Sequence, residues 1–207
     1  REETLRLSQP CSAILAADGT LVLAVDGDGH RDERIIKSKD RGATWTVGKG
    51  DMKAACDKKY VIHPALYQRR DGSLFAFLRG QFPMPGVVST DMGESWQMVE
   101  TPFPGISVGQ KPTVLRLQSG ALVFASADSK RASIGGNFVA LSFDDGKTWP
   151  HIHKLNNMFG YMYLAQAPNG TIYLTGGRGS AINVMAFNEA WLKTGNQKLE
   201  GKPETRN

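Results

Sequence analysis

β-Branched and other apolar residues gather in four segments of the chain, and a glycine-containing turn interrupts each segment once. Short runs of such residues are typical of β-strands, and Asp-Gly or Asn-Gly between two such runs is typical of a β-hairpin. The pattern therefore predicts four hairpins with two-residue turns. The turns are Asp18-Gly19 in SAILAADGTLVLAV, Asp71-Gly72 in PALYQRRDGSLFAFL, Ser119-Gly120 in PTVLRLQSGALVFAS and Asn169-Gly170 in YLAQAPNGTIYLTG.

A second motif, S-x-D-x-G-x-[ST]-W, follows each of the first three hairpins, at residues 38–45, 89–96 and 142–149. Its aspartate can accept hydrogen bonds from the N–H groups of its own turn, and its glycine supplies a positive φ. The Ser or Thr hydroxyl locks the loop, and the tryptophan covers apolar surface. We therefore interpret the motif as a folding device rather than a catalytic one.

Hairpin and motif together repeat about every fifty residues, which is the period of blades in a β-propeller. From about Gln9 to Leu192 the chain resembles the Asp-box, or BNR-repeat, propellers, of which the sialidases are members. The resemblance implies an all-β, six-bladed propeller of the sialidase type, with four blades in this chain. We expect them at about 9–50, 60–105, 108–155 and 160–192, within a domain at 1–195 that a tail at 196–207 follows.

The fourth repeat lacks the second motif and runs instead through INVMAFNEAWLKTG, which predicts a last blade followed by a short helical turn. If the sialidase pattern holds, two more blades are expected upstream of Arg1. The alternative is that four blades close on themselves.

Composition changes this picture little. Of the 207 residues 41% are hydrophobic and 22% charged, as in an ordinary globular protein, and no apolar run reaches the roughly 18 residues of a membrane span. The net charge of +5 suits an acidic glycan, although a plain basic surface explains it equally well. Cys11 and Cys56 have no metal-site spacing, and Cys11 lies in an apolar strand, which favours a buried free thiol over a disulfide.

Blade topology separates the candidate chemistry from the hairpins and Asp-boxes, because these turns share one face and the other connections share the opposite rim. Sialidases bind a sugar carboxylate with three arginines and use a tyrosine nucleophile, a glutamate that activates it and an aspartate acid/base. The resemblance assigns two of the arginines to Arg79 and Arg131, and the nucleophile to Tyr161. At the expected place of the glutamate stands His63, which can serve as a base but departs from the sialidase pattern.

Further candidates for substrate binding on this rim are Arg178, Lys111 and Gln110. Each candidate also has a plain structural interpretation: the arginines as solvated loop cations, Tyr161 as a packed aromatic and His63 as a residue that caps its strand. The loop Asp26-Gly27-Asp28-Gly29-His30 resembles a calcium loop but lacks the terminal glutamate of an EF-hand, so we expect no metal and no cofactor.

The function that these residues favour is an exported glycoside hydrolase, secreted or periplasmic, that removes a terminal acidic sugar from glycans. Two alternatives stay open: a propeller that binds glycan or protein without catalysis, and a polysaccharide lyase in which His63 and Tyr161 act as base and acid. We expect an acidic glycan as partner, no nucleic acid and no membrane span. The sequence leaves the oligomeric state open.

Overall fold

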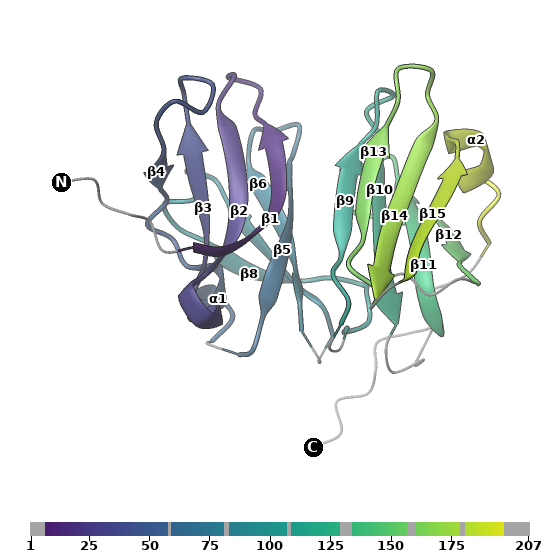
Figure 1. Cartoon of the computed structure of the whole chain (residues 1–207), viewed down its shortest axis with the longest axis horizontal. Coiled ribbons are helices and arrows are strands. Elements are labelled where there is room, and N and C mark those ends of the chain that lie inside the picture. The colour runs from purple at the N-terminus through teal and green to yellow at the C-terminus, as the bar shows by residue number, and fades with distance from the viewer. Residues whose placement is uncertain are drawn as a thin grey trace. The chain divides into compact units, whose positions relative to one another are not determined.

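The computed structural model describes residues 7–57, 59–80, 83–106, 109–128, 134–156, 160–178 and 181–196. Their strands form four antiparallel sheets, in each of which consecutive strands are neighbours (Figure 1). The chain divides into two compact units, one of Arg1–Leu78 with Pro85–Glu100 and the other of Arg79–Met84 with Thr101–Asn207. The predicted all-β repeat is thereby confirmed.

The first unit holds two four-stranded sheets and two short helices. The first sheet consists of β1 (Leu7–Leu15), β2 (Leu21–Gly27), β3 (Glu33–Ser38) and β4 (Thr46–Val47), and the second of β5 (Ile62–Gln68), β6 (Leu74–Arg79), β7 (Pro85–Ser89) and β8 (Gln97–Glu100). A 3-10 turn, η1 (Asp28–His30), joins β2 to β3, and α1 (Met52–Ala55) follows the first sheet.

The second unit holds a four-stranded sheet and a sheet with three described strands. The former consists of β9 (Thr113–Arg116), β10 (Leu122–Asp128), β11 (Gly136–Ser142) and β12 (His151–Lys154), and the latter of β13 (Tyr163–Gln166), β14 (Ile172–Arg178) and β15 (Ala181–Phe187). The predicted helical turn is present as α2 (Glu189–Leu192). The residue that caps its N-terminus is Asn188, whose side chain accepts a hydrogen bond from the Trp191 N–H. Both α-helices are only four residues long, and no described helix has the length and hydrophobicity of a membrane span.

The hairpin turns are one residue larger than the predicted two-residue loops. In the first, the Gly19 N–H donates to the Ala16 carbonyl at 2.9 Å, and the Ala16 N–H donates to the Thr20 carbonyl at 2.8 Å. Gly19 has a φ of 83°, while Asp18 is not among the described residues with positive φ. A type I′ turn needs positive φ at both central residues, so this is a three-residue turn that ends in a glycine bulge. The other three hairpins repeat it.

The Asp-box motifs form the closed turns that their sequence predicts. In the first copy, Asp40 accepts hydrogen bonds from the Ser38 hydroxyl at 2.7 Å and from the Thr44 N–H at 2.8 Å. The Thr44 hydroxyl donates to the second oxygen of the same carboxylate. The Ser38 hydroxyl in turn accepts from the Gly42 N–H at 2.8 Å, and the copies at 89–96 and 142–149 repeat this network. Each motif therefore ties the end of a third strand to the start of the fourth.

Phe103 forms the centre of an aromatic cluster in the core of the second unit. Its exposed fraction is 1%, and its ring centroid lies 4.5 Å from that of Phe124, 5.5 Å from that of Phe138 and 5.2 Å from that of Trp149. The aromatic residue that the Asp-box contributes, Trp149, is thus part of this cluster and not only a cover for it.

Replacement of Phe103 by alanine is expected to lower the free energy of unfolding by about 3–5 kcal/mol, because it opens a cavity among three rings. Urea unfolding followed by tryptophan fluorescence measures the change. Phe143→Ala is the matched control, since that ring is 41% exposed and its loss should cost about 0.5 kcal/mol or less. Equal costs for the two variants would contradict the placement of Phe103 in the core.

The Asp-boxes predict a loss of stability in acid. Hydrogen bonds from the Ser95 and Ser89 side chains and the Ser95 backbone hold the pKa of Asp91 at about 2, below its ordinary 3.8. A group with a lowered pKa contributes stability above its unfolded pKa and loses it as the pH falls through its folded pKa. Thermal melting between pH 4 and pH 2 should therefore show a smaller drop for Asp91→Asn than for the unmodified chain. The control Asp57→Asn, at an exposed aspartate outside the motifs, should leave the drop unchanged.

Candidate functional site

His63, Lys111 and Tyr161 occupy the same position in three successive repeats. Each lies eight residues before the first turn residue of its hairpin, where the chain enters the first strand of a sheet. His63 belongs to the first unit, and Lys111 and Tyr161 belong to the second. All three are candidate site residues predicted from the sequence, and they share one structural position, the entry of the first strand of a sheet.

His63 is a buried residue that Asp26 holds by two hydrogen bonds. Its side chain and backbone are 2% exposed, its Nδ1 lies 2.6 Å from Asp26 Oδ2, and its N–H donates to Asp26 Oδ1 at 2.9 Å. Its φ is 55°, a left-handed conformation that is uncommon for a residue with a side chain and is disfavoured before a proline such as Pro64. The Asp26 carboxylate therefore fixes both the ring and a strained backbone, which is more than capping a strand.

Asp26 and Glu33 share the charge of this cluster unequally. They lie opposite each other on β2 and β3, and both are fully buried. Burial favours the neutral form of Asp26, but hydrogen bonds with His63 and the interaction with Glu33 outweigh it and hold the pKa of Asp26 below its ordinary value. Burial, and next the neighbouring Asp26, raise the pKa of Glu33 to about 11. At neutral pH Asp26 thus carries the negative charge and Glu33 a proton.

Cys11 adds a thiol to the same cluster. Its Sγ lies 3.3 Å from Asp26 Oδ1 and 3.8 Å from His63 Nδ1. Sulfur and carboxylate thus approach the same ring nitrogen, which is not the order of a Cys-His-Asp triad, where they face opposite nitrogens. Both cysteines are buried free thiols, as the apolar context of Cys11 predicts.

Lys111 is a buried cation, and no described residue accepts a hydrogen bond from its ammonium group. Its exposed fraction is 1%, and its Nζ lies 4.6 Å above the ring centroid of Tyr163. An aromatic face compensates only part of the cost of removing an ammonium group from water. Among the described residues, the Tyr163 ring is therefore the one group that offsets the buried ammonium of Lys111.

Tyr161 lies beside Lys111 in the chain's only described bridge outside the named strands. Its N–H donates to the Gly177 carbonyl at 3.4 Å, and the next residue, Met162, donates from its N–H to the Lys111 carbonyl at 3.3 Å. A Cβ at Gly176 would lie 2.9 Å from the Tyr161 carbonyl oxygen, so the close approach of β14 requires glycine there. Tyr161 itself is half-buried, and Gln110, next to Lys111, is also half-buried.

Of the three arginines predicted to bind substrate, the structure describes the side chain of Arg79 alone, so their convergence stays a prediction. Arg79 ends β6 and is 5% exposed, so it is not the solvated loop cation of the plain interpretation. Arg178 ends β14, but its side chain lies outside the described part, as does the whole of Arg131. Of the cations predicted to bind an acidic sugar, only Lys111 therefore has a described, unsatisfied charge.

Glu33 is not among the predicted site residues, and Asp26, which the sequence places in a loop, lies within β2. The available signal was the position of Glu33, because it takes the inward place in the alternation that continues through Ile35. A charged residue at such a place indicates a buried polar cluster.

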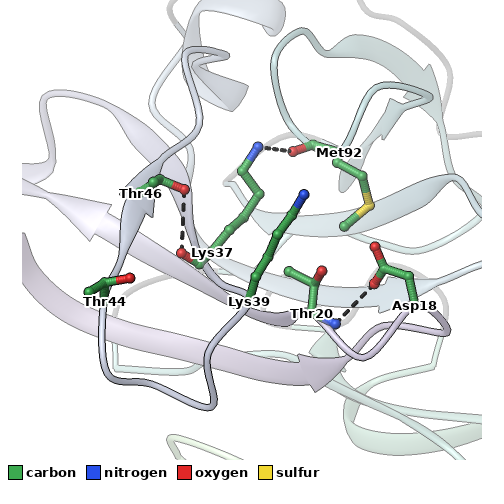
Figure 2. Close-up of a pocket in the computed structure, with 7 residues that line it drawn as sticks. All are labelled: Asp18, Thr20, Lys37, Lys39, Thr44, Thr46 and Met92. Atoms are coloured by element: carbon green, nitrogen blue, oxygen red, sulfur yellow. Dashed lines mark hydrogen bonds between the residues drawn. The ribbon is translucent and has the colours of Figure 1, made fainter.

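A pocket of about 480 Å³ lies in the first unit, and none of these residues lines it (Figure 2). Figure 2 shows that hairpin and Asp-box residues line it, and they are Asp18, Thr20, Lys37, Lys39, Thr44, Thr46 and Met92. The Lys37 ammonium already donates to the Met92 carbonyl at 2.9 Å and pairs with Glu94 at 2.7 Å. Because the protein itself satisfies the Lys37 ammonium, we interpret this pocket as a gap between turns.

A family model described as a BNR repeat-like domain matches residues 2–174. The chain belongs to this family. Its four sheets are accordingly blades of a sialidase-like β-propeller, which confirms the resemblance that the Asp-boxes indicate. No curated protein matches the chain.

Solved structures similar to this BNR repeat-like chain share its fold at low sequence identity. An intramolecular trans-sialidase from Ruminococcus gnavus, in complex with oseltamivir carboxylate, is 18% identical, with a TM-score of 0.67 over 87% of this chain and 44% of that one. The NanB sialidase of Streptococcus pneumoniae is 16% identical, with a TM-score of 0.71 over 88% and 31%. A protein of unknown function from Dyadobacter fermentans is 17% identical, with a TM-score of 0.64 over 84% and 51%. The chain spans about half or less of each.

Lys111→Met is expected to stabilise the BNR repeat-like chain by about 1 kcal/mol or more, because it keeps the apolar stem and removes a buried, uncompensated charge. Urea unfolding measures the difference. Lys39→Met, at an exposed lysine, is the control and should change stability by about 0.5 kcal/mol or less. A less stable Lys111→Met variant would show that the ammonium is compensated within the protein.

Proposed function

We propose that this chain forms part of a six-bladed, sialidase-like glycoside hydrolase that removes a terminal acidic sugar from glycans. The observation that supports this most is Lys111, whose buried ammonium has no described acceptor and lies at the entry of a propeller strand beside Tyr161. A sugar carboxylate would supply the missing acceptor and offset the cost of burying the charge. Arg79, Arg131, Arg178 and Gln110 are proposed to bind the same sugar.

In this proposal Tyr161 is the nucleophile. A neutral phenol avoids the repulsion that a carboxylate nucleophile would meet beside an anionic sugar, and sialidases are the known exception to catalysis by two carboxylates. Its oxygen forms a bond to the anomeric carbon while the bond to the leaving oxygen breaks. Water then hydrolyses the tyrosyl intermediate.

His63 is proposed to take the place of the glutamate base. Since Asp26 is ionised and can only accept a hydrogen bond, Nδ1 of His63 carries the proton that points to it at 2.6 Å. The neutral ring then has its basic lone pair on Nε2, which is the nitrogen that would receive the phenolic proton. Asp26 is a positioning residue that fixes this tautomer.

A lyase is the second candidate, and the same histidine is the observation that favours it. A His-Asp pair can remove the proton next to the carboxylate of a uronic acid, and Tyr161 can protonate the leaving oxygen. This reaction needs no nucleophile and leaves an unsaturated sugar as product. A propeller that binds acidic glycans without turnover is the third candidate.

Glycans with terminal acidic sugars are abundant outside the cell, so we further propose that the protein is secreted or periplasmic. The domain is proposed to extend through residue 195. Neither proposal affects the choice among the three candidate activities.

Tyr161→Phe should abolish release of the terminal sugar, by about a thousand-fold or more, while glycan binding persists. The assay incubates the protein with sialylated and uronic-acid-containing glycans and identifies the products by mass spectrometry. Tyr173→Phe is the control, because that ring is 40% exposed on β14 and plays no part in the proposal.

Three other outcomes contradict the hydrolase. If the Tyr161→Phe variant keeps full turnover, Tyr161 is not the nucleophile. An unsaturated uronide indicates the lyase, and binding with no turnover on the whole panel indicates a binding module. If Lys111→Met binds the glycans as tightly as the unmodified protein does, the proposed carboxylate contact is wrong.

A further inference from the structure

Asp26, His30 and Glu33 bring three metal-binding side chains to one place in the first unit. Their ligand atoms, one from each residue, all lie within 4.8 Å of one another. Asp26 and Glu33 are fully buried, while the His30 side chain is 38% exposed. The cluster is therefore closed on the protein side and open to solvent through His30.

Glu33 has a fully buried carboxyl group that interacts with the Asp26 carboxylate. Both its oxygens are inaccessible to solvent, and neither makes a hydrogen bond of good geometry with a described residue. His30 Nδ1 is also buried and without such a bond. Buried polar atoms are rarely left unsatisfied, and here Glu33 and His30 each bring one ligand atom to within 4.8 Å of a carboxylate oxygen of Asp26. A bound cation would satisfy both side chains at once.

The distances select among the groups around Asp26. Two ligands of a tetrahedral ion with bonds of about 2.0–2.1 Å lie about 3.3 Å apart. His30 Nδ1 lies 3.4 Å from Asp26 Oδ2, which fits, whereas His63 Nδ1 lies 2.6 Å from the same oxygen, which is a hydrogen bond. His63 is thus the outer partner that orients a ligating carboxylate.

The local fold holds the three ligands in place. Asp26 and Glu33 form a directly opposed pair on β2 and β3, so their side chains project from the same face. Between them, η1 carries His30 with a φ of 57°, and Lys53 Nζ donates to the His30 carbonyl at 2.6 Å. A Cβ at Gly27 would meet the Asp32 side chain at 1.6 Å, so glycine is required for this tight turn.

We propose that Asp26, His30 and Glu33 bind one divalent ion of the zinc class. An imidazole nitrogen and two carboxylates suit Zn²⁺, and water can fill the fourth position on the side that His30 leaves open. The EF-hand glutamate that the loop lacks is not needed, because Glu33 reaches the site from the next strand. The ion would share Asp26 with the proposed base His63, whereas His30 and Glu33 have no role in the proposed glycosidase chemistry.

The test is zinc binding by the metal-stripped protein, measured by isothermal titration calorimetry and native mass spectrometry. One ion per chain is expected. His30→Ala should weaken binding at least 100-fold, since even outer-shell partners account for about 10–100-fold. This half-exposed residue can be replaced without emptying the core. His151→Ala, at a half-buried histidine in the second unit, is the matched control and should bind zinc unchanged.

Glu33→Gln tests the buried ligand, with Glu94→Gln at the surface as its control. The site is supported if Glu33→Gln loses zinc binding and Glu94→Gln keeps it. The proposal is overturned if no stoichiometric zinc binds, or if His30→Ala and Glu33→Gln both bind it as the unmodified protein does. Should Glu33→Gln fail to fold, His30→Ala decides.

Co²⁺ in place of Zn²⁺ tests the ligand set directly. Tetrahedral cobalt gives intense visible absorption, and ligation by Cys11 would add a thiolate charge-transfer band in the near ultraviolet. We expect the visible absorption of tetrahedral cobalt and no thiolate charge-transfer band. A charge-transfer band that disappears in Cys11→Ser would overturn the assignment in favour of the group of Cys11, Asp26 and His63.

Discussion

The pairing of antiparallel strands at a fixed distance from a glycine turn is the constraint on which the rest of this structure depends. Each hairpin closes with the same two backbone hydrogen bonds around a glycine of positive φ. Because the turn fixes the register, the residue eight positions before it stands at the entry of the first strand in the last three repeats. His63, Lys111 and Tyr161 are there for this reason, although their chemistry has nothing in common.

Two of these entry residues are part of buried charged groups, and burying a charge costs free energy. Asp26 is ionised beside His63, and Lys111 is held against Tyr163 with no described acceptor. A core built only for stability would hold apolar residues at such places, because these replace buried charges at little cost or with a gain. These buried polar groups are therefore where the molecule departs from the requirements of folding, and such places are where functional sites are expected.

The sequence predicted the elements of the fold well because its signals are local. The short apolar runs, the glycine turns and the Asp-box each act within about ten residues, and all four hairpins and the final helical turn are present. The turn type was wrong, because Asp18 and its equivalents do not take the positive φ that a two-residue loop needs. In the candidate site, the entry residues could be predicted from the repeat. The spacing of Glu33, His30 and Asp26 in the sequence does not predict that they lie together. Their proximity depends on the pairing of β2 with β3, which places Asp26 opposite Glu33.

The residue before the positive-φ glycine is a side-chain acceptor in every hairpin. Aspartate, serine and asparagine occur there, and each accepts a hydrogen bond from the backbone N–H two residues on, at Asp18, Asp71, Ser119 and Asn169. A combinatorial library at this position that is restricted to Asp, Asn, Ser and Thr therefore keeps this hydrogen bond as well as the glycine that the backbone requires. The same hairpins are then attachment points for labels or short grafted peptides, at the end of each sheet opposite the entry residues.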